Sequence, residues 1–307
     1  MNGHPPSPSS PESAQRQPPA RVRIVTDSAS DILQSHARAI GIIVVPNRIV
    51  MDGHIFRDGI DISAAQFYAR LPKARPAPYT EPASPADFYQ AYETAFAQGA
   101  TAIVSIHVSN QFSQVVRHAT VARDYLAPAP IHIIDSLQLG IGMWPAVIEA
   151  SRIAHLGAPV QAIHERVISL LARTHVFVMV ESLEPLRRSG RISRVQGLVG
   201  SLIDAHPILT LDQGEARLIE TVRSRRRAVL RLGELAHELE RSVGGVESLL
   251  ICGTSIESIA EMETLLAAKY AGMIRKTWLG PTIGANLGPA IAVALVAGDQ
   301  PSQSSRP

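Results

Sequence analysis

The chain alternates short apolar runs with longer segments in which apolar residues recur every three or four positions. The runs "VRIVTD", "GIIVVP", "ATAIVSIHVS" and "PIHIIDS" predict strands, and "RIVMDGHIFRDG", with its D-G turn, predicts a small hairpin. The helical spacing predicts helices over 29–40, 63–71, 84–97 and 111–126. Because strands that are apolar throughout are typical of parallel sheets covered on both faces, this half of the chain is expected to contain one.

The pattern changes after two long helical segments at 138–155 and 159–173. "HPILTLDQGEARLIETV" predicts a hairpin around Gln213 and Gly214, and "HVFVMV", "VESLLICGTS" and "AIAVALVAG" predict further strands around a helix over 255–270. We therefore expect an α/β protein with two α/β domains. Residues 21–175 form the first, with a mainly parallel sheet, and residues 176–298 form the second, with a mixed sheet. Residues 1–20 and 299–307, which are rich in Pro and Ser, are expected to be disordered tails.

The longest uncharged run, "LGPTIGANLGPAIAVALVAG" at 279–298, has the length of a membrane span. Prolines and glycines crowd its first half, which favours a turn leading into a buried strand over a spanning helix. The first twenty residues lack the apolar stretch of a secretory signal. We expect a cytoplasmic protein without a transmembrane segment.

Composition excludes several classes of function. Hydrophobic residues make up 46% of the 307 positions and charged residues 18%, which is enough apolar material for a large core. A net charge of +2 and 5% aromatic residues argue against nucleic acid binding. The single cysteine, Cys252, excludes an intrachain disulfide and a cysteine metal site. With no nucleotide-binding glycine motif and no H-E-x-x-H either, neither a cofactor nor a metal is expected.

Small polar residues lie where the predicted parallel strands end: Thr26 and Ser28, Ser109 and Ser113, Asp135 and Ser136. In an open α/β sheet these ends form the ligand crevice. Individually they have structural explanations as well, since Ser28 with Asp31 fits a capping box. His107, inside an apolar strand, is expected to be a hydrogen-bonded core histidine.

Seven segments occur together in a characteristic order: "RIVTDSASDI", "TEPASPADFYQAY", "IHVSNQFSQVVRHA", "IHIIDSLQLGIG", "LEPLRRSGRIS", "HPILTLDQGEARL" and "LGPTIGANLGP". In order and spacing the chain resembles the DegV family of bacterial fatty-acid-binding proteins over residues 22–297. The resemblance implies two α/β domains with one long-chain fatty acid buried between them. It also implies a carrier role, in which a separate ATP-dependent kinase subunit phosphorylates the bound carboxylate to an acyl phosphate.

The resemblance also implies a head-group site. The family's carboxylate-binding threonine falls on Thr80 of "TEPASP", its serine on Ser113 of "FSQVV", and its usual histidine on Asn286 of "NLGPA". Asn286 can donate a hydrogen bond but cannot carry a proton or a positive charge, so the head-group chemistry is expected to differ. Other departures from the family pattern are Glu81, Gln114 and Val115.

Residues expected to support this site are Asp27, Ser28, Ser109 and Arg191 of "SGRI". The "TDS" end of the first strand is expected to shape the base of the crevice, with Asp27 and Ser28 capping or supporting its hydroxyl network. A buried carboxylate needs such partners, because an unpaired buried charge is very unfavourable.

Two other functions remain open. One is a hydrolase or transferase that uses Ser113 with His107 or His118 as its base, although five positions between Ser113 and His118 suit a shared helix face poorly. The other is a lipid-binding regulator without turnover. A basic cluster at the start of a predicted helix is either a solvated face or a docking patch for the kinase subunit. Its members are Arg223, Arg225, Arg226 and Arg227.

Overall fold

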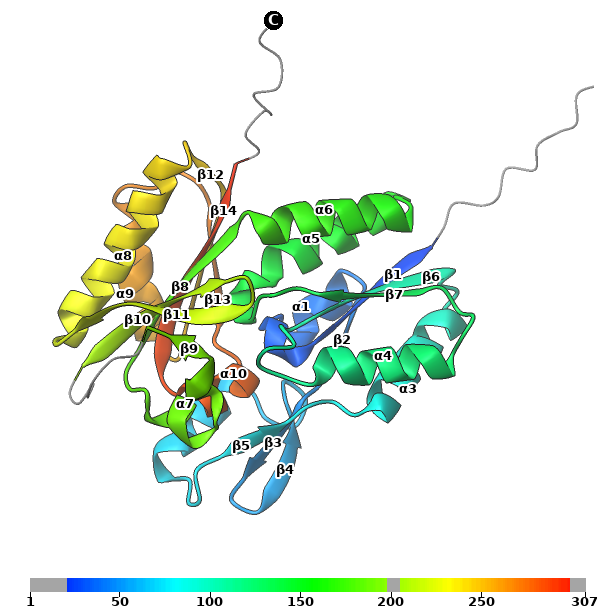
Figure 1. Cartoon of the computed structure of the whole chain (residues 1–307), viewed down its shortest axis with the longest axis horizontal. Coiled ribbons are helices and arrows are strands. Elements are labelled where there is room, and N and C mark those ends of the chain that lie inside the picture. Colours follow the sequence, from blue (N-terminus) through cyan, green and yellow to red (C-terminus); the bar gives the residue numbers. More distant parts are fainter. Residues whose placement is uncertain (1–20, 198–204, 299–307) are drawn as a thin grey trace, which may run out of the picture.

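The computed structural model describes residues 21–197 and 205–298 (Figure 1). The tails expected at 1–20 and 299–307 lie outside the described residues. Two main sheets and a small third one organise the chain, one main sheet being parallel and the other mixed. The predicted α/β class is therefore confirmed. A domain boundary near residue 175 stays a prediction, although strands up to Asp135 build the first main sheet and those from Thr174 build the second.

The first main sheet has four parallel strands in the order β2-β1-β6-β7. These are β2 (Ile42–Val45), β1 (Val22–Asp27), β6 (Ala102–His107) and β7 (Ile131–Asp135). Two helix pairs cover its two faces, α3 (Pro85–Ala97) with α4 (Val115–Tyr125), and α5 (Trp144–His155) with α6 (Val160–Ala172) (Figure 1). Every residue of β6 is buried, as expected for a central strand between two helical layers. The carboxyl ends of the strands point toward the second sheet (Figure 1).

The small sheet has the order β4-β3-β5 and is antiparallel. Its strands are β3 (Arg48–Met51), β4 (His54–Arg57) and β5 (Tyr79–Glu81). The predicted hairpin is confirmed, since Asp52 and Gly53 both adopt positive φ at its turn, as a two-residue hairpin loop requires. Thr80 pairs with Ile49 on β3, and Ile49 packs with Phe67 of α2 (Ala64–Arg70) and Ala285 of α10 (Pro281–Leu287). The small sheet thus holds Thr80 near α10.

The second main sheet has seven strands in the order β13-β12-β14-β8-β10-β11-β9. They are β8 (Thr174–Val180), β9 (Val195–Gln196), β10 (His206–Asp212), β11 (Glu215–Val222), β12 (Val246–Gly253), β13 (Ile274–Trp278) and β14 (Ala290–Ala297). The hairpin around Gln213 and Gly214 is confirmed. Because side chains alternate along a strand, Met179 and Ile291 pack under α8 (Arg225–Ser242) and α9 (Ile256–Ala267), whereas Val178 and Ala292 face the other way and line a cavity.

Several sequence expectations were wrong locally. The turn expected after Leu279 is the helix α10, which begins at Pro281, a position where the missing N–H removes no helical bond. The helix expected over 29–40 is a 3₁₀ turn (Ser28–Ser30) followed by α1 (Gln34–Ala39), because Asp31 adopts φ 56 between them. The helices expected from 111 and 138 begin later, at Val115 and Trp144. Strands β5 and β13 and helix α7 (Glu184–Arg188) were not predicted.

The capping box expected from Ser28 and Asp31 is also wrong. Ser28 Oγ accepts from the backbone N–H of Asn47 at 3.0 Å, and Asp31 Oδ1 accepts from that of Gly280 at 2.9 Å. Both side chains therefore connect distant segments instead of capping their own helix. Across the described residues we find no helix with the length and apolarity needed to cross a bilayer.

Candidate functional site

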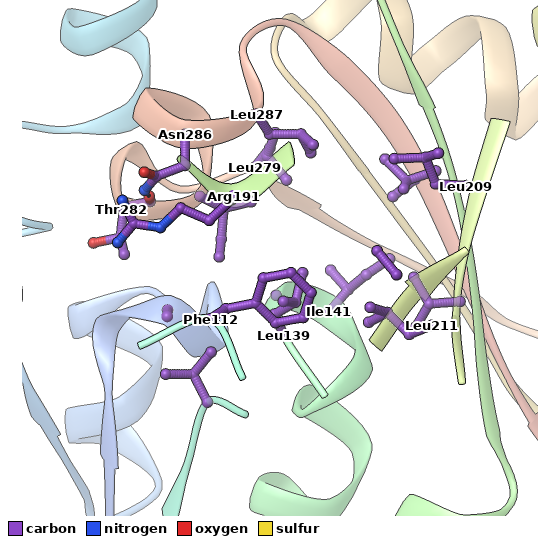
Figure 2. A pocket seen from close by; sticks show the side chains of 18 of the residues that line it. Phe112, Leu139, Ile141, Arg191, Leu209, Leu211, Leu279, Thr282, Asn286 and Leu287 are labelled. Carbon is purple, nitrogen blue, oxygen red and sulfur yellow. Dashed lines mark hydrogen bonds between the residues drawn. The ribbon is translucent and has the colours of Figure 1, made fainter. Parts of the chain in front are cut away.

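A cavity lies between the two main sheets, with about 970 Å³ of space including its opening to solvent (Figure 2). Most of its lining is apolar and comes from the second sheet, from α10 and from the loops that follow the first sheet's strands. Representative residues are Phe112, Leu139, Ile141, Leu209, Leu211 and Leu287. The cavity therefore suits a long apolar molecule.

Several polar side chains interrupt this apolar lining. Thr80, Ser113, Arg191, Thr282 and Asn286 all line the cavity. In Figure 2, Arg191, Thr282 and Asn286 lie toward one end of the view and Leu209 and Leu211 toward the other. The three residues expected to bind a carboxylate, Thr80, Ser113 and Asn286, thus line one cavity, from β5, the loop before α4, and α10.

Asn286 has both of its amide protons engaged. Its Nδ2 donates to Thr80 Oγ1 at 3.0 Å and to the backbone oxygen of Thr282, one helical turn earlier, at 2.9 Å. Because Thr80 Oγ1 accepts this bond, its own proton is left to donate elsewhere. Asn286 Oδ1 is buried and has no hydrogen-bond partner in the described part of the chain. The asparagine therefore orients the threonine hydroxyl that shares the cavity with it.

Arg191 supplies the positive charge of the site. It lies half-buried in the 3₁₀ helix Arg191–Arg194, and its Nη1 donates to the backbone oxygen of Ser189 at 2.8 Å. Burial lowers the pKa of Arg191, but an arginine remains protonated in a protein. Within residues 21–197 and 205–298, no carboxylate forms an ion pair with it. A cation without an ion-pair partner on a mostly apolar wall favours an anionic ligand.

Asp27 and Ser28 lie behind the cavity and do not line it. Asp27 Oδ1 accepts from the N–H of Ala29 at 3.0 Å and from Asn47 Nδ2 at 3.3 Å, and Oδ2 accepts from the N–H of Val108 at 3.2 Å. Ser28 Oγ lies 3.2 Å from Thr282 Oγ1. These contacts fit a supporting role, in which the end of β1 fixes the loops around the cavity.

Ser109 makes a contact between the two main sheets. Its Oγ donates to the backbone oxygen of Gly214 at 3.2 Å, at the tip of the β10–β11 hairpin. Gly214 has φ +82, and a Cβ built on it would lie 3.0 Å from Ser109 Oγ. The close approach of hairpin and loop therefore requires glycine at this position.

A serine, a histidine and an aspartate form a chain of hydrogen bonds away from the cavity. Ser105 Oγ is 2.7 Å from His107 Nε2, and His107 Nδ1 is 3.1 Å from Asp27 Oδ2. All three residues have 0% exposure, and none lines the cavity. A catalytic serine must reach its substrate, so this network is structural, and His107 is confirmed as a hydrogen-bonded core residue.

The two histidines considered as a base for Ser113 are engaged with other partners. His118 Nδ1 bonds the backbone oxygen of Ala83 at 2.8 Å, and the ring nitrogens of His107 are occupied as described above. In the part of the chain that the structure covers, neither histidine hydrogen-bonds Ser113, so the hydrolase alternative finds no general base here.

The arginines at the start of α8 are only partly free. Arg225 forms ion pairs with Glu181 and Glu261, at 3.0 and 3.1 Å. Arg223, Arg226 and Arg227 are exposed and form no ion pair with a described carboxylate. Their role in docking a partner stays a prediction.

The sequence analysis singled out Arg191 but not the positive charge of its segment, "LRRSGRISR", which forms part of the cavity wall through Leu186 and Arg191. Arg187, Arg188 and Arg194 on it are exposed. The signal was present as four arginines within eight positions.

Two buried carboxylates, Asp31 and Asp58, bond the start of α10, and the sequence analysis did not consider Asp58. Asp58 Oδ2 accepts from the N–H of Thr282 at 3.1 Å and from its hydroxyl at 2.5 Å. Burial raises the pKa of Asp58 to about 6 and raises that of Asp31 well above its usual value. Among the described residues no cluster of three or more His, Cys, Asp or Glu side chains could hold a metal ion.

Comparison with known proteins gives one consistent family. Residues 21–298 match the model of a family described as uncharacterised proteins of the DegV family. A DegV domain-containing protein of Caldanaerobacter subterraneus is 34% identical over 209 residues, which are 68% of this chain and 74% of that protein. A second, from Streptomyces coelicolor, is 28% identical over 278 residues, or 90% of this chain and 98% of that protein.

Solved structures resemble the whole described fold. A DegV family protein from Thermus thermophilus, described by its fatty acid binding, has a TM-score of 0.80 and 25% identity, covering 91% of this chain and all, 100%, of that one. DegV from Bacillus subtilis, described as a fatty acid binding protein, has a TM-score of 0.80 and 24% identity over 90% of this chain and 99% of that one. The second comparison, below 25% identity, is evidence for the fold alone.

Proposed function

Because the chain belongs to the DegV family, we propose that it binds a long-chain fatty acid in the cavity between its two main sheets. The observation that carries the proposal is the cavity's composition: a mostly apolar wall that also carries Thr80, Ser113, Asn286 and Arg191, with Asn286 hydrogen-bonded to Thr80. The Thermus thermophilus relative, described by its fatty acid binding, supports the same ligand class. The acyl chain lies along the apolar wall and the carboxylate lies at the polar residues.

The apolar wall supplies most of the affinity. Burying about fourteen methylenes at roughly 0.8 kcal/mol each yields on the order of 11 kcal/mol before the losses of association and ordering. Leu209, Leu211 and Leu279 are examples of the lining residues that the acyl chain would contact. Polar contacts along the acyl chain would add little to the affinity, so the contacts of the carboxylate decide which way round the fatty acid lies.

The polar residues satisfy the carboxylate. The Thr80 hydroxyl, which accepts from Asn286, has its proton free for a carboxylate oxygen, and the Ser113 hydroxyl offers a second donor. Arg191 adds a positive charge that no described carboxylate neutralises. Asn286 itself acts through Thr80, since both of its amide protons are engaged.

We further propose that the chain presents this carboxylate to a separate ATP-dependent kinase subunit. The exposed Arg187, Arg188 and Arg194 belong to the same segment as Leu186 and Arg191 of the cavity wall. Their positive charges would attract an anionic partner surface or a nucleotide phosphate. A regulator that binds lipid without turnover has the same site, and adding the kinase subunit and ATP separates the two.

The test compares two ligands on delipidated protein. Oleate and methyl oleate share one chain, but only oleate carries a carboxylate. We expect oleate to bind at least about tenfold more tightly, the difference that one charge-assisted hydrogen bond supplies. Equal affinities would contradict the proposed head-group site, and no binding of either ligand would contradict the function.

A further inference from the structure

We propose that Asp58 is a proton-linked positioning residue of the head-group site, which controls through Thr282 how strongly this end of the cavity holds an anion. The inference rests on the proposed fatty acid site. Asp58 does not line the cavity, whereas Thr282, which it hydrogen-bonds twice, does.

The directions of the hydrogen bonds follow from the chemistry of the two ends. The backbone N–H of Asn47 can only donate, and it does so to Ser28 Oγ at 3.0 Å. At the other end an ionised Asp58 can only accept, and Thr282 Oγ1 lies 2.5 Å from its Oδ2. Thr282 therefore gives its single hydroxyl proton to Asp58. The Ser28 hydroxyl, 3.2 Å from Thr282 Oγ1 and also hydrogen-bonded to Asp58, donates to one of these two acceptors. The chain of donors runs away from the cavity and ends on Asp58.

This arrangement makes Thr282 a poor donor to a ligand while Asp58 is ionised. A hydrogen bond to a charged acceptor is about twice as strong as one to a neutral acceptor. Protonation of Asp58 weakens its hold on the Thr282 hydroxyl, which can then rotate toward the cavity that it lines. Thr282 and Asn286 are four positions apart on α10 and so share one face of it. Protonation thus adds a third hydroxyl donor beside the two expected ones.

Charge acts in the same direction. Asp58 is 3% exposed, and the groups that bear on it are mainly acidic: Asp27 on β1, Asp31 after the first 3₁₀ turn, and Tyr68 on α2. His107 faces Asp27, not Asp58. A second, separate hollow is lined by both Asp58 and Arg38 of α1. Arg38 is exposed there, and its Nε donates to the backbone oxygen of Gln34. No described cation forms an ion pair with Asp58.

The sign of the linkage follows. Burial raises the pKa of Asp58 to about 6. A carboxylate bound nearby disfavours a second negative charge and raises this pKa further. Above pH 6 the binding of a fatty acid anion therefore takes up a proton at Asp58. By reciprocity, the affinity for the anion falls as pH rises through and above that value.

The first test measures proton uptake directly. Titration calorimetry of oleate, held monomeric by cyclodextrin, is run near neutral pH in two buffers with different heats of ionisation. We expect uptake of up to about one proton by the wild-type protein and close to none by Asp58→Asn, since its amide oxygen accepts both Thr282 bonds without titrating. Asp124→Asn, which removes an exposed carboxylate of α4, is the matched control and should behave as wild type.

A pH series gives the second readout. Between about pH 6 and 8, the ratio of wild-type to Asp58→Asn dissociation constants should grow by up to about tenfold per pH unit, the limit for one linked proton. Taking this ratio cancels the ionisation of the ligand itself. Thr282→Ser keeps the hydroxyl and should keep the linkage, whereas Thr282→Val should reduce the uptake.

The outcomes are distinct. Oleate binding with the same proton uptake and pH dependence in wild type and Asp58→Asn overturns this inference alone. Full uptake in Thr282→Val overturns the route through Thr282, and this variant also decides the matter if Asp58→Asn does not fold. Failure of the wild-type protein to bind oleate overturns the proposed function and this inference together.

Discussion

Asn286 Nδ2 donates to Thr80 Oγ1 at 3.0 Å, which joins α10 to the small sheet across 206 positions of sequence. This bond fixes the direction of the threonine hydroxyl, because an oxygen that accepts from an amide has its proton free for another acceptor. The head-group site is therefore assembled by tertiary contacts between segments that are far apart in the chain.

Replacing Thr80 by Val should weaken fatty acid binding by about 1.5–3 kcal/mol, roughly one to two decades, because a donor to a buried carboxylate is lost. Ser113→Ala should have a similar effect, since its hydroxyl lines the same cavity. Calorimetric titration with oleate measures both. Thr264→Val is a matched control, because that hydroxyl bonds the backbone of its own helix at Ala260 and lies outside the cavity. Parent-like affinity in both site variants would refute the head-group assignment.

Asn286→Ala should weaken oleate binding about as much as Thr80→Val, although its own amide protons do not point to a ligand. The reason is that the orientation of the Thr80 hydroxyl depends on it. The double variant should then lose clearly less than the sum of the two single losses, as coupled neighbours do. Full additivity in this double-mutant cycle would show that the two residues act independently.

Asp58→Asn should stabilise the empty protein more at high pH than at low pH. Burial raises the pKa of Asp58 from 3.8 in its ordinary state to about 6. Because Asp58 binds its proton more tightly in the folded protein than in the unfolded chain, this proton stabilises the fold at pH values below the unfolded-state pKa. That stabilisation, up to about 3 kcal/mol, is lost as the pH rises through the folded-state pKa. Urea unfolding of both proteins at pH 5 and pH 8 measures the difference. A stability gain that is the same at both pH values would argue against the raised pKa.

Replacing Arg225, Arg226 and Arg227 by Ala should leave fatty acid binding intact but slow acyl phosphate formation by a cognate kinase subunit, more at low salt than at high salt. Exposed charges at an interface act mainly on association rate. Arg225 also pairs with Glu181 and Glu261, so unfolding must be measured alongside. Unchanged phosphorylation would assign the cluster to solvation, and lost oleate binding would assign it to the fold.

Local patterns were enough to predict much of the fold. The apolar runs of β1, β6 and β7 and the Gln213-Gly214 hairpin depend on neighbouring residues only, and all were found as expected. β13 was missed because its sequence, "IRKTW", mixes charges with apolar residues at the edge of the sheet.

α10 was missed for a different reason. Its prolines and glycines normally break helices. The carboxylates that accept hydrogen bonds from the backbone N–H groups at its start lie far away in the sequence: Asp31 accepts from Gly280 and Asp58 accepts from Thr282. Asp58 and Thr282 are 224 positions apart, so no local pattern could have joined them. The family resemblance, in contrast, placed Thr80, Ser113 and Asn286 on one cavity, since it draws on the whole chain.

The central claim is that the cavity holds one fatty acid, and native mass spectrometry of the full chain tests it most directly. The protein is measured as purified, then after delipidation, and then after addition of oleate or palmitate. We expect a mass increase equal to one fatty acid in the first and third states and none in the second. A protein that is empty as purified and gains no mass with either fatty acid would contradict the account.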